Sequence, residues 1–341
     1  MAGEKIRNME EFAAVSGISR PTLSKYFNDP DSVRATTRAR IEQALDRYDY
    51  RPNVFAVNQN RKATKNIGIL VPFLADPFFA EVARNLEHRC IAAGYQPVLY
   101  SAHGQPHLEA EILDELRALK PAGVLLAPLG RLSDRKAIER FCADVPTVLF
   151  DSAMDGVGRA FVGSNSQNFA DQMVDYLCRT GEPPCLLEMK NPANPNANKR
   201  RMAYLTAMER LGQDPQVVKI DGEGWSIEEI GKRGGGAALA DGFFKTNTIL
   251  CSNDRLAIGL LAASYEQGVR VGLKPDCDIR IAGQDDHPFS RYTCPALTTI
   301  AQDYDAVAAR AVETLVAAIN GEPIKTARTL FDGRLVMRQS A

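Results

Sequence analysis

The stretch GISRPTLSKYFND, residues 17–29, decides how the amino-terminal part of the chain folds. It predicts a short helix that begins after Ser19, with Pro21 near its start, where a missing backbone N–H costs little. Leu23 and Phe27 are four residues apart and place their apolar side chains on one face of that helix. The opposite face is polar and basic, so the helix has a surface that packing does not use.

Two further helices flank this one and predict a helix-turn-helix. Asn8 can cap a helix that Gly17 ends, because glycine tolerates a positive φ, and a third helix is expected at about residues 36–47. The second helix of such a unit would expose Arg20, Pro21, Thr22, Ser24 and Lys25. Short polar and basic side chains suit the base edges and phosphates of a DNA major groove. The alternative is an ordinary surface helix with solvated charges.

Length and composition indicate a globular protein with two or three hydrophobic cores. The chain has 341 residues, of which 45% are hydrophobic and 24% charged. No apolar run approaches the ~18 residues that a membrane helix needs. The start, MAGEKIRNMEEFAA, carries acids where a signal peptide needs an apolar stretch. We therefore expect a cytoplasmic protein.

Charge is unevenly distributed along the chain. Residues 1–65 hold 12 Lys and Arg against 8 Asp and Glu, a net of +4, and the rest of the chain holds 29 against 34, a net of −5. A basic head on an acidic body indicates a polyanionic partner for the head alone. The seven cysteines show no CxxC spacing, so we expect reduced, mostly buried thiols rather than disulfides or a zinc site.

From residue 67 onward, short β-rich runs alternate with amphipathic helical stretches. The strand candidates are IGILVPF (67–73), PVLYSA (97–102), GVLLAPL (123–129), TVLFDS (147–152), AFVGS (160–164), CLLEM (185–189), VVKI (217–220), TILCSN (248–253), IRIAG (279–283) and LTTIA (297–301). Continuous apolar strands between helices predict parallel sheets covered on both faces. About ten strands exceed one Rossmann-like unit, so we expect two doubly wound α/β lobes.

Polar and aromatic residues follow several of these strands. Ligands of such sheets bind beyond the carboxyl ends of the strands. The side chains at those places are Asp76, Phe78, Phe79, Asp151, Asn165, Asn253, Asp254, Gln284, Asp285 and Asp286. Carboxylates, amides and aromatic rings together suit a polyhydroxylated ligand. Taken singly, each position is equally typical of a turn or a helix N-cap.

The segments described so far resemble the lactose-repressor (LacI/GalR) family of transcription regulators. In the head the resemblance rests on FAAVSGISRPTLSKYFND, VRATTRARIEQAL and YDYRPN; in the body it rests on IGILVP, DPFF, CSNDRLAIGLL, IAGQDD and PALTTIAQD. It covers nearly the whole chain, and the combination is specific although no single motif is. The resemblance implies a dimeric repressor of a pseudo-palindromic operator, controlled by a small polar effector such as a sugar or sugar derivative.

The same resemblance implies a domain organisation. A helix-turn-helix headpiece is expected at 1–50, a hinge helix or linker that folds on operator DNA at 51–65, and an effector-binding and dimerisation core at 66–338. The core should resemble a type I periplasmic sugar-binding protein. Its N-lobe is expected at about 66–164 plus 296–323, and its C-lobe at about 165–295 plus 324–338.

The family pattern also implies which residues contact DNA. They are Ser19, Arg20, Pro21, Thr22, Ser24, Lys25, Asn28, Arg34, Asn53, Ala56 and Gln59. Because proline cannot hydrogen-bond a base edge, Arg20 and Lys25 should provide most of the direct base readout. In the hinge, Val57 stands where the family commonly has arginine, and Gln59 where it has a leucine that wedges into the minor groove.

The effector-binding residues carried over from the family lie in the core. They are Asp76, Phe78, Phe79, Asp151, Asn165, Arg200, Asn253, Asp254, Asp285 and Gln302. Arg200 matches the arginine that grips ligand oxygens better than its rival Arg201. Asn165 stands where the family often has aspartate, and Gln284 replaces a common aromatic residue. Either Asn253 or Asp254 completes the set.

Other features indicate no catalytic, cofactor or metal site. Residues 234–236 are three glycines without P-loop spacing, and a close helix contact or helix start explains them better. His103 and His107 are separated by Gly and Pro, which favours a surface loop. Trp225 could line the cleft or open a helix. The C-terminal RLVMRQSA has no leucine heptad, so no coiled-coil tetramer is expected. The alternatives are a cytosolic solute-binding protein and an α/β enzyme acting on a sugar or nucleotide.

Overall fold

The structure is a computed structural model that describes residues 6–51, 64–193 and 195–341. The chain divides into two compact units, residues 1–64 and 65–341, and each is described by itself. The hinge residues Asn53, Ala56, Val57 and Gln59 lie outside the described part of the chain.

Three α-helices build the head: α1 (Met9–Ser16), α2 (Arg20–Asn28) and α3 (Ala35–Tyr48), with a short 3-10 turn η1 (Pro30–Ser32) between the last two. Asn8 caps α1 by accepting the Glu11 N–H at 2.9 Å, and Gly17 ends it at φ 65°, as predicted. Ser19 precedes α2, but its side chain does not cap the helix as predicted. Its hydroxyl forms a hydrogen bond with Thr22 Oγ1 at 2.8 Å and none with a backbone amide.

The head has its own small core. Phe12, Leu23 and Ile41 contribute one side chain from each helix and are fully buried. Tyr50 stacks on Phe12 with ring centroids 4.5 Å apart. This packing uses one face of α2 and leaves the other exposed.

The first lobe is built on a six-stranded parallel sheet of order β11-β5-β4-β3-β1-β2. Its elements are β1 (Asn66–Val71), α5 (Pro77–Ala92), β2 (Gln96–Ser101), α6 (Pro106–Leu119), β3 (Gly123–Leu126), η2 (Gly130–Leu132), α7 (Arg135–Asp144), β4 (Thr147–Phe150), β5 (Ala160–Ser164), α13 (Tyr304–Ile319) and β11 (Arg328–Phe331). Apolar side chains of α5 and α13 cover one face, and those of α6 and α7 cover the other. Both faces of the inner strands β1, β3, β4 and β5 are buried, as the continuous apolar strands predicted, and the edge strands β2 and β11 are partly exposed.

The second lobe is built on a four-stranded parallel sheet of order β7-β6-β8-β9 and a small antiparallel pair, β10-β12. Its elements are α8 (Ser166–Thr180), β6 (Cys185–Met189), α9 (Ala197–Arg210), β7 (Gln216–Ile220), α10 (Ile227–Ile230), the π-helical turn η3 (Gly231–Gly235), α11 (Gly236–Ala240), β8 (Thr248–Cys251), α12 (Asp254–Glu266), β9 (Arg280–Ala282), β10 (Thr299–Ala301) and β12 (Arg334–Val336). The glycines at 234–236 make a close helix contact, because a Cβ on Gly236 would lie 2.8 Å from Ala263 Cβ.

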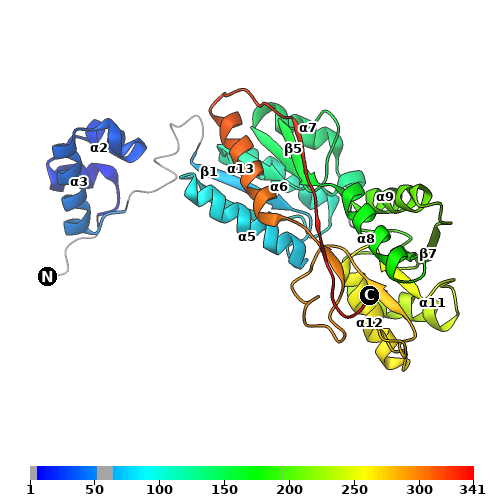
Figure 1. Cartoon of the computed structure of the whole chain (residues 1–341). Coiled ribbons are helices and arrows are strands. Elements are labelled where there is room, and N and C mark those ends of the chain that lie inside the picture. The colour runs from blue at the N-terminus through cyan, green and yellow to red at the C-terminus, as the bar shows by residue number, and fades with distance from the viewer. Residues whose placement is uncertain (1–5, 52–63, 194) are drawn as a thin grey trace. The chain divides into compact units, whose positions relative to one another are not determined.

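The chain passes three times between the lobes, near residues 165, 302 and 332. This corrects two expected boundaries. Residues 324–331 belong with the first lobe, because β11 pairs with β5. Residues 296–301 belong with the second, because β10 pairs with β12 and Thr298 bridges to Ala282 of β9. In Figure 1 the C-terminal segment (red) runs from the first lobe to the second.

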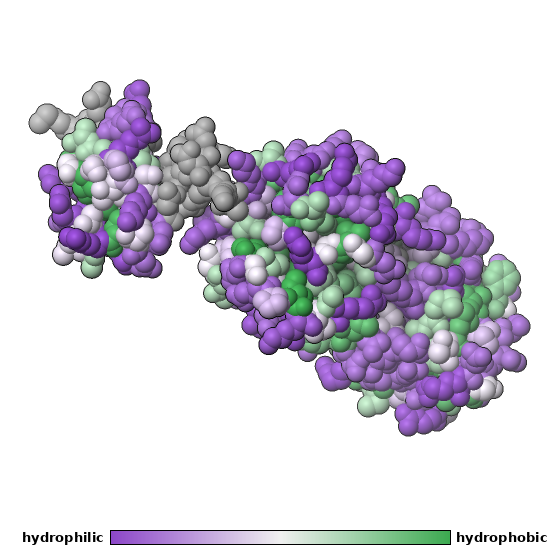
Figure 2. Space-filling model, turned by 90° about the horizontal axis from the view of Figure 1, so that it is seen from above, coloured by the Kyte–Doolittle hydropathy of each residue, from purple (hydrophilic) through white to green (hydrophobic). Residues whose placement is uncertain are grey.

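The face of the protein seen in Figure 2 is mostly hydrophilic, with scattered hydrophobic residues. Among the helices of the described residues, none is both long and apolar enough to cross a membrane. All seven cysteines are free thiols, but burial is less general than expected: Cys90, Cys185 and Cys251 are buried, and Cys294 is exposed.

Candidate DNA interface and effector site

The exposed face of α2 carries most of the residues predicted to contact DNA. Arg20, Pro21 and Lys25 are exposed, and Thr22 and Ser24 are partly buried toward the head core. Asn28 is the last residue of α2, and the exposed Arg34 directly precedes α3.

Arg20 is an exposed cation of this face. It pairs with Glu10 of α1 at 3.1 Å, and both side chains are about two-thirds exposed, at 65% and 71%. An ion pair this exposed contributes little stability, so Arg20 can exchange Glu10 for another anion or a base edge at little cost.

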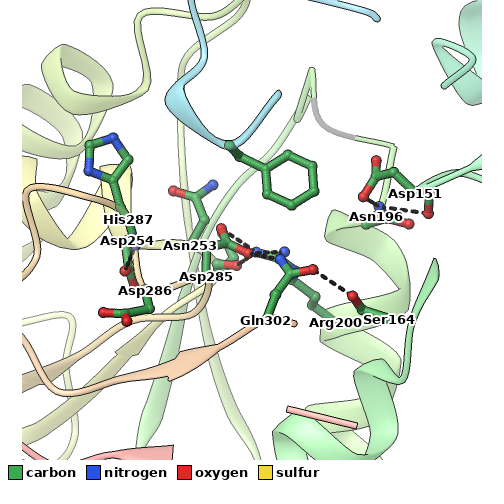
Figure 3. A network of polar contacts seen from close by, with 12 residues as sticks. Asp151, Ser164, Asn196, Arg200, Asn253, Asp254, Asp285, Asp286, His287 and Gln302 are labelled. Atoms are coloured by element: carbon green, nitrogen blue, oxygen red, sulfur yellow. Dashed lines mark hydrogen bonds and ion pairs between the residues drawn. The ribbon is translucent and has the colours of Figure 1, made fainter. Parts of the chain in front are cut away.

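In the core, Arg200 and Asp285 form the centre of a polar network at the carboxyl ends of the second-lobe strands (Figure 3). The Arg200 guanidinium, which is 6% exposed, binds both Asp285 oxygens. Its Nη1 donates to Oδ2 at 3.0 Å and to the Ser252 carbonyl at 2.8 Å. The rival Arg201 instead pairs with Glu188 at 3.2 Å.

Gln302 links this pair to the first lobe. Its Nε2 donates to Asp285 Oδ1 at 2.6 Å, and its Oε1 accepts the Ser164 hydroxyl at the end of β5 at 2.5 Å. The Tyr304 hydroxyl donates to the Asp285 carbonyl at 2.6 Å. Because Gln302 lies where the chain passes between the lobes, the network couples the site to that crossing.

Asp151 follows β4 and faces the network from the first lobe (Figure 3). Its φ is 58°, and its Oδ1 accepts the Asn196 amide of the second lobe at 2.8 Å. Its Oδ2 is buried and has no hydrogen-bond partner among the described residues. Burial raises the pKa of Asp151 to about 6, against the opposing charges of Lys199 and Arg200.

A cavity of about 10 Å³, room for one water molecule, adjoins this carboxylate. It is lined by Phe78, Val82, Phe150, Asp151, Gly163, Ser164, Gln302, Tyr304 and Val307. The rings of Phe78 and Tyr304 meet there edge to face, with centroids 5.6 Å apart.

Asp254, one of the two expected alternatives, forms its hydrogen bonds within the second lobe. It is fully buried and accepts hydrogen bonds from Ser290 Oγ at 2.6 Å, Thr299 Oγ1 at 2.6 Å and the His287 N–H at 2.8 Å. It therefore holds the loop after β9 in place. Burial, with the nearby Asp285 charge, raises the pKa of Asp254 to about 7.

Four other predicted residues have structural contacts. Phe79 is fully buried in the first-lobe core, so it is not part of the polar site. Asn165 caps α8 and donates to Asp332 at 2.8 Å. Asn253 caps α12 by accepting the Leu256 N–H at 2.8 Å. Asp76 caps α5 and pairs with an arginine of the second lobe, Arg255, at 3.1 Å; burial raises its pKa, which Arg255 opposes.

A larger cavity of about 550 Å³ opens between the lobes beside this network. It is lined by His103, Gly104, Gln105, Leu129, Arg131, Leu132, Asn191, Pro192, Ala193, Pro195, Asn198, Glu223, Gly224 and Trp225. Trp225 thus lines the cleft and also lies two residues before the start of α10, next to the N-cap residue Ser226. None of the ten predicted effector residues is among these lining residues of the described chain.

Sequence reasoning missed Asn196, Ser164, Tyr304 and Arg255. Asn196 lies in the loop before α9, where no strand end marks it, and Arg255 follows Asn253-Asp254 but reads as a helix residue. Two of them had a signal, since Ser164 ends the predicted strand 160–164 and Tyr304 comes two residues after the predicted Gln302.

Comparison with known proteins finds a matching family for each of the two units. Residues 8–53 match the family of bacterial regulatory proteins, lacI family, and residues 180–341 match the periplasmic binding protein-like domain. The chain is 26% identical over 334 residues to the ribose operon repressor of Escherichia coli (strain K12), covering 98% of this chain and 99% of that protein. It is 27% identical over 340 residues to the HTH-type transcriptional repressor CytR of the same strain, covering 99% and 97%.

Solved structures agree on the fold. The lac repressor dimer bound to operator and the anti-inducer ONPF superposes with a TM-score of 0.84 at 25% identity, covering 98% of this chain and 99% of that one. A periplasmic binding protein/LacI transcriptional regulator from Alkaliphilus metalliredigens QYMF, complexed with D-xylulofuranose, has a TM-score of 0.69 at 22% identity, covering 81% and 99%.

Proposed function

Because the chain is a member of the lacI family of bacterial regulatory proteins, we propose that it is a transcriptional repressor whose affinity for DNA is set by a small polar effector. The effector is a sugar or sugar derivative bound between the two lobes. A homodimer binds a pseudo-palindromic operator, since two-fold symmetry of the protein matches two-fold symmetry of the site. The names of the relatives support this assignment: a ribose operon repressor, the repressor CytR and an operator-bound lac repressor dimer.

The exposed face of α2 supports the DNA-binding part. Arg20 and Lys25 lie on a helix whose other face is fixed by Leu23 in the head core, so the two cations are presented on a rigid element. The net charge of +4 on residues 1–65 adds attraction for phosphates. Arg20 and Lys25 read base edges, Ser19, Thr22, Ser24, Asn28 and Arg34 hold the backbone, and Asn53, Ala56 and Gln59 contact the minor groove.

The polar network between the lobes is the observation that carries the effector part. It joins Arg200, Asp285 and Gln302, and it faces Asp151, whose buried Oδ2 lacks a partner among the described residues. A sugar hydroxyl both donates and accepts, so one hydroxyl can satisfy Asp151 while others exchange with the Asp285–Gln302 contact. Phe78 supplies an apolar face beside them.

Binding to a pool of randomised duplexes tests the DNA-binding part. Selection at moderate salt should enrich a pseudo-palindromic sequence, and anisotropy titration should show that Arg20→Ala weakens binding to it about tenfold or more, since a two-pronged arginine–guanine contact contributes about 1–3 kcal/mol. Arg40→Ala is the matched control, because it removes the same charge from an exposed position of α3. A pool without any preferred sequence would overturn the assignment.

Thermal stability across a panel of sugars, polyols, sugar acids, sugar phosphates and nucleosides tests the effector part. A ligand of the folded state at ~100-fold excess over its dissociation constant adds about 2.7 kcal/mol of stability. We expect a stabilising sugar whose effect is lost in Asp151→Asn and kept in Asp144→Asn, a surface carboxylate of the same lobe. A panel in which only non-sugars stabilise the protein would contradict the sugar assignment and leave the DNA-binding part intact.

A further inference from the structure

Arg255 joins the two lobes by a buried ion pair. It is the second residue of α12 in the second lobe, and its Nη1 donates to Asp76 Oδ2 of the first lobe at 3.1 Å. The Arg255 side chain is 11% exposed and the Asp76 side chain 5% exposed. A guanidinium placed this far from water needs its partners, so the contact is a built feature of the junction between the lobes.

The remaining donors of Arg255 stay within its own lobe. Nε and Nη2 bind the two oxygens of Glu228 at 2.7 and 2.6 Å, and Nη2 also donates to the Trp225 carbonyl at 2.8 Å. These contacts fix the guanidinium before it meets the first lobe. When the lobes separate, Arg255 therefore keeps Glu228 and loses only Asp76, so the pair can open without leaving an isolated buried cation.

Trp225, whose carbonyl accepts a hydrogen bond from Arg255, packs against the first lobe. The Trp225 ring stacks on Phe73, with centroids 5.1 Å apart and planes 17° apart, and meets Phe79 edge to face at 6.1 Å. It also abuts Gly104, since a Cβ at that glycine would lie 2.3 Å from Trp225 Nε1. The ion pair and the tryptophan thus cross the junction at one place.

We propose that Arg255 and Asp76 form a latch that holds the two lobes closed before any effector binds. The latch rests on the proposed function, because there the effector acts by changing the angle between the two lobes. The latch sets the ratio of closed to open molecules before the effector binds. The effector can shift that ratio only by the difference between its affinities for the closed and the open state. Asp76, which the family pattern assigns to the effector, is then occupied by Arg255.

The latch can be measured in the free protein with its own fluorophore. Trp225 is the single tryptophan of the chain, so its emission and its quenching by acrylamide report on this junction alone. We expect Arg255→Gln and Asp76→Asn each to raise the quenching constant by about twofold and to shift emission to the red, as closed molecules open. Small-angle scattering should show a larger radius of gyration for both variants.

The variants are chosen to separate opening from misfolding. Asp76→Asn keeps the α5 cap, because asparagine caps helices as well as aspartate does, so only the charge across the junction is lost. Arg84→Gln, a surface pair with Glu81, controls for the loss of an arginine.

Wild-type quenching and wild-type radius of gyration in both Arg255→Gln and Asp76→Asn would overturn the proposal. An equal change in Arg84→Gln would also overturn it, because the effect would then follow the loss of any arginine and not the loss of this pair. The measurement uses neither DNA nor effector, so its outcome is independent of the outcome of the operator and sugar experiments.

Discussion

Asp151 shows how one partly satisfied carboxylate makes stability depend on pH. Its folded-state pKa of about 6 lies above the ordinary value of 3.8 because the group is buried. Between about pH 4 and about pH 6 the folded protein therefore binds more protons than the unfolded chain. For an acid with a raised pKa, the sign is that stability falls as the pH rises through this window.

We expect Asp151→Asn to remove this contribution. Its free energy of unfolding should change less between about pH 4 and about pH 6 than that of the wild type, by on the order of 2 kcal/mol. At about pH 7 the variant should be the more stable protein, because no ionised carboxylate remains buried there. Urea denaturation at the two ends of the window measures the difference, and equal pH slopes for the two proteins would contradict it.

Gly104 is a second position where one residue controls the junction between the lobes. We expect Gly104→Ala to disturb the closed state, because its φ of 71° suits glycine and a Cβ would lie 2.3 Å from Trp225 Nε1. The red shift and quenching of Trp225 measure the effect. In addition, placing alanine in the left-handed backbone conformation of Gly104 should lower the free energy of unfolding by roughly 1–2 kcal/mol.

Gly94→Ala separates these two effects. Gly94 lies in the same lobe at φ 81°, and nothing lies within 4 Å of the Cβ that it lacks. The control should lose a similar amount of stability and keep the wild-type Trp225 emission. A red shift in both variants would mean that backbone strain, not the contact with Trp225, opens the junction.

At the scale of single elements, α2 has two roles in the head. One of its faces is exposed, and its other face contributes Leu23 to the core that the three helices share. We expect Leu23→Ala to cost about 2–5 kcal/mol, which is of the order of the whole stability of so small a unit. The head should then unfold while the core remains folded, so operator binding is lost and sugar binding is kept. Limited proteolysis followed by mass spectrometry locates the unfolded part.

Val15→Ala is the control in the same head, because Val15 is 46% exposed. It should resist proteolysis as the wild type does. Cleavage throughout the core of Leu23→Ala would show that the head and the core do not unfold independently.

The sequence predicted the elements whose burial is continuous and missed those that lie at an edge. The strands 67–73 and 123–129 are apolar throughout, and their central residues are buried, as Val124, Leu125 and Leu126 show. β11 and β12 are short and contain exposed and half-buried residues but no buried ones, so no continuous apolar run marked them. Without β11, residues 324–331 were assigned to the second lobe instead of the first.

The site was predictable as a region and less so as a set of side chains. Adjacent residues at the start of a helix point in different directions, so the sequence could not separate Phe78 from the buried Phe79. Nor could it show that Asn253 caps a helix while Asp254 binds the loop after β9. Contacts between distant segments, such as Asp151 with Asn196, depend on how the lobes meet and leave no mark in either segment alone.

For the whole molecule, the uneven charge predicts how salt affects DNA binding. The head carries only +4 and the rest of the chain −5, so few counterions are released when a head meets DNA. We expect a modest slope of log affinity against log salt, about −4 for each bound head. Anisotropy titrations at several KCl concentrations measure the slope, and a much steeper dependence would contradict the prediction.

The triple passage of the chain between the lobes has a consequence during synthesis on the ribosome. The first lobe lacks α13, which covers one face of its sheet, and β11, which pairs with β5, until the entire second-lobe helical layer has been translated. At about 5–20 residues per second, roughly seven to thirty seconds pass between the appearance of β5 and that of α13. During this interval a nascent chain exposes an apolar sheet face and an open edge strand, the features that chaperones recognise and that promote aggregation.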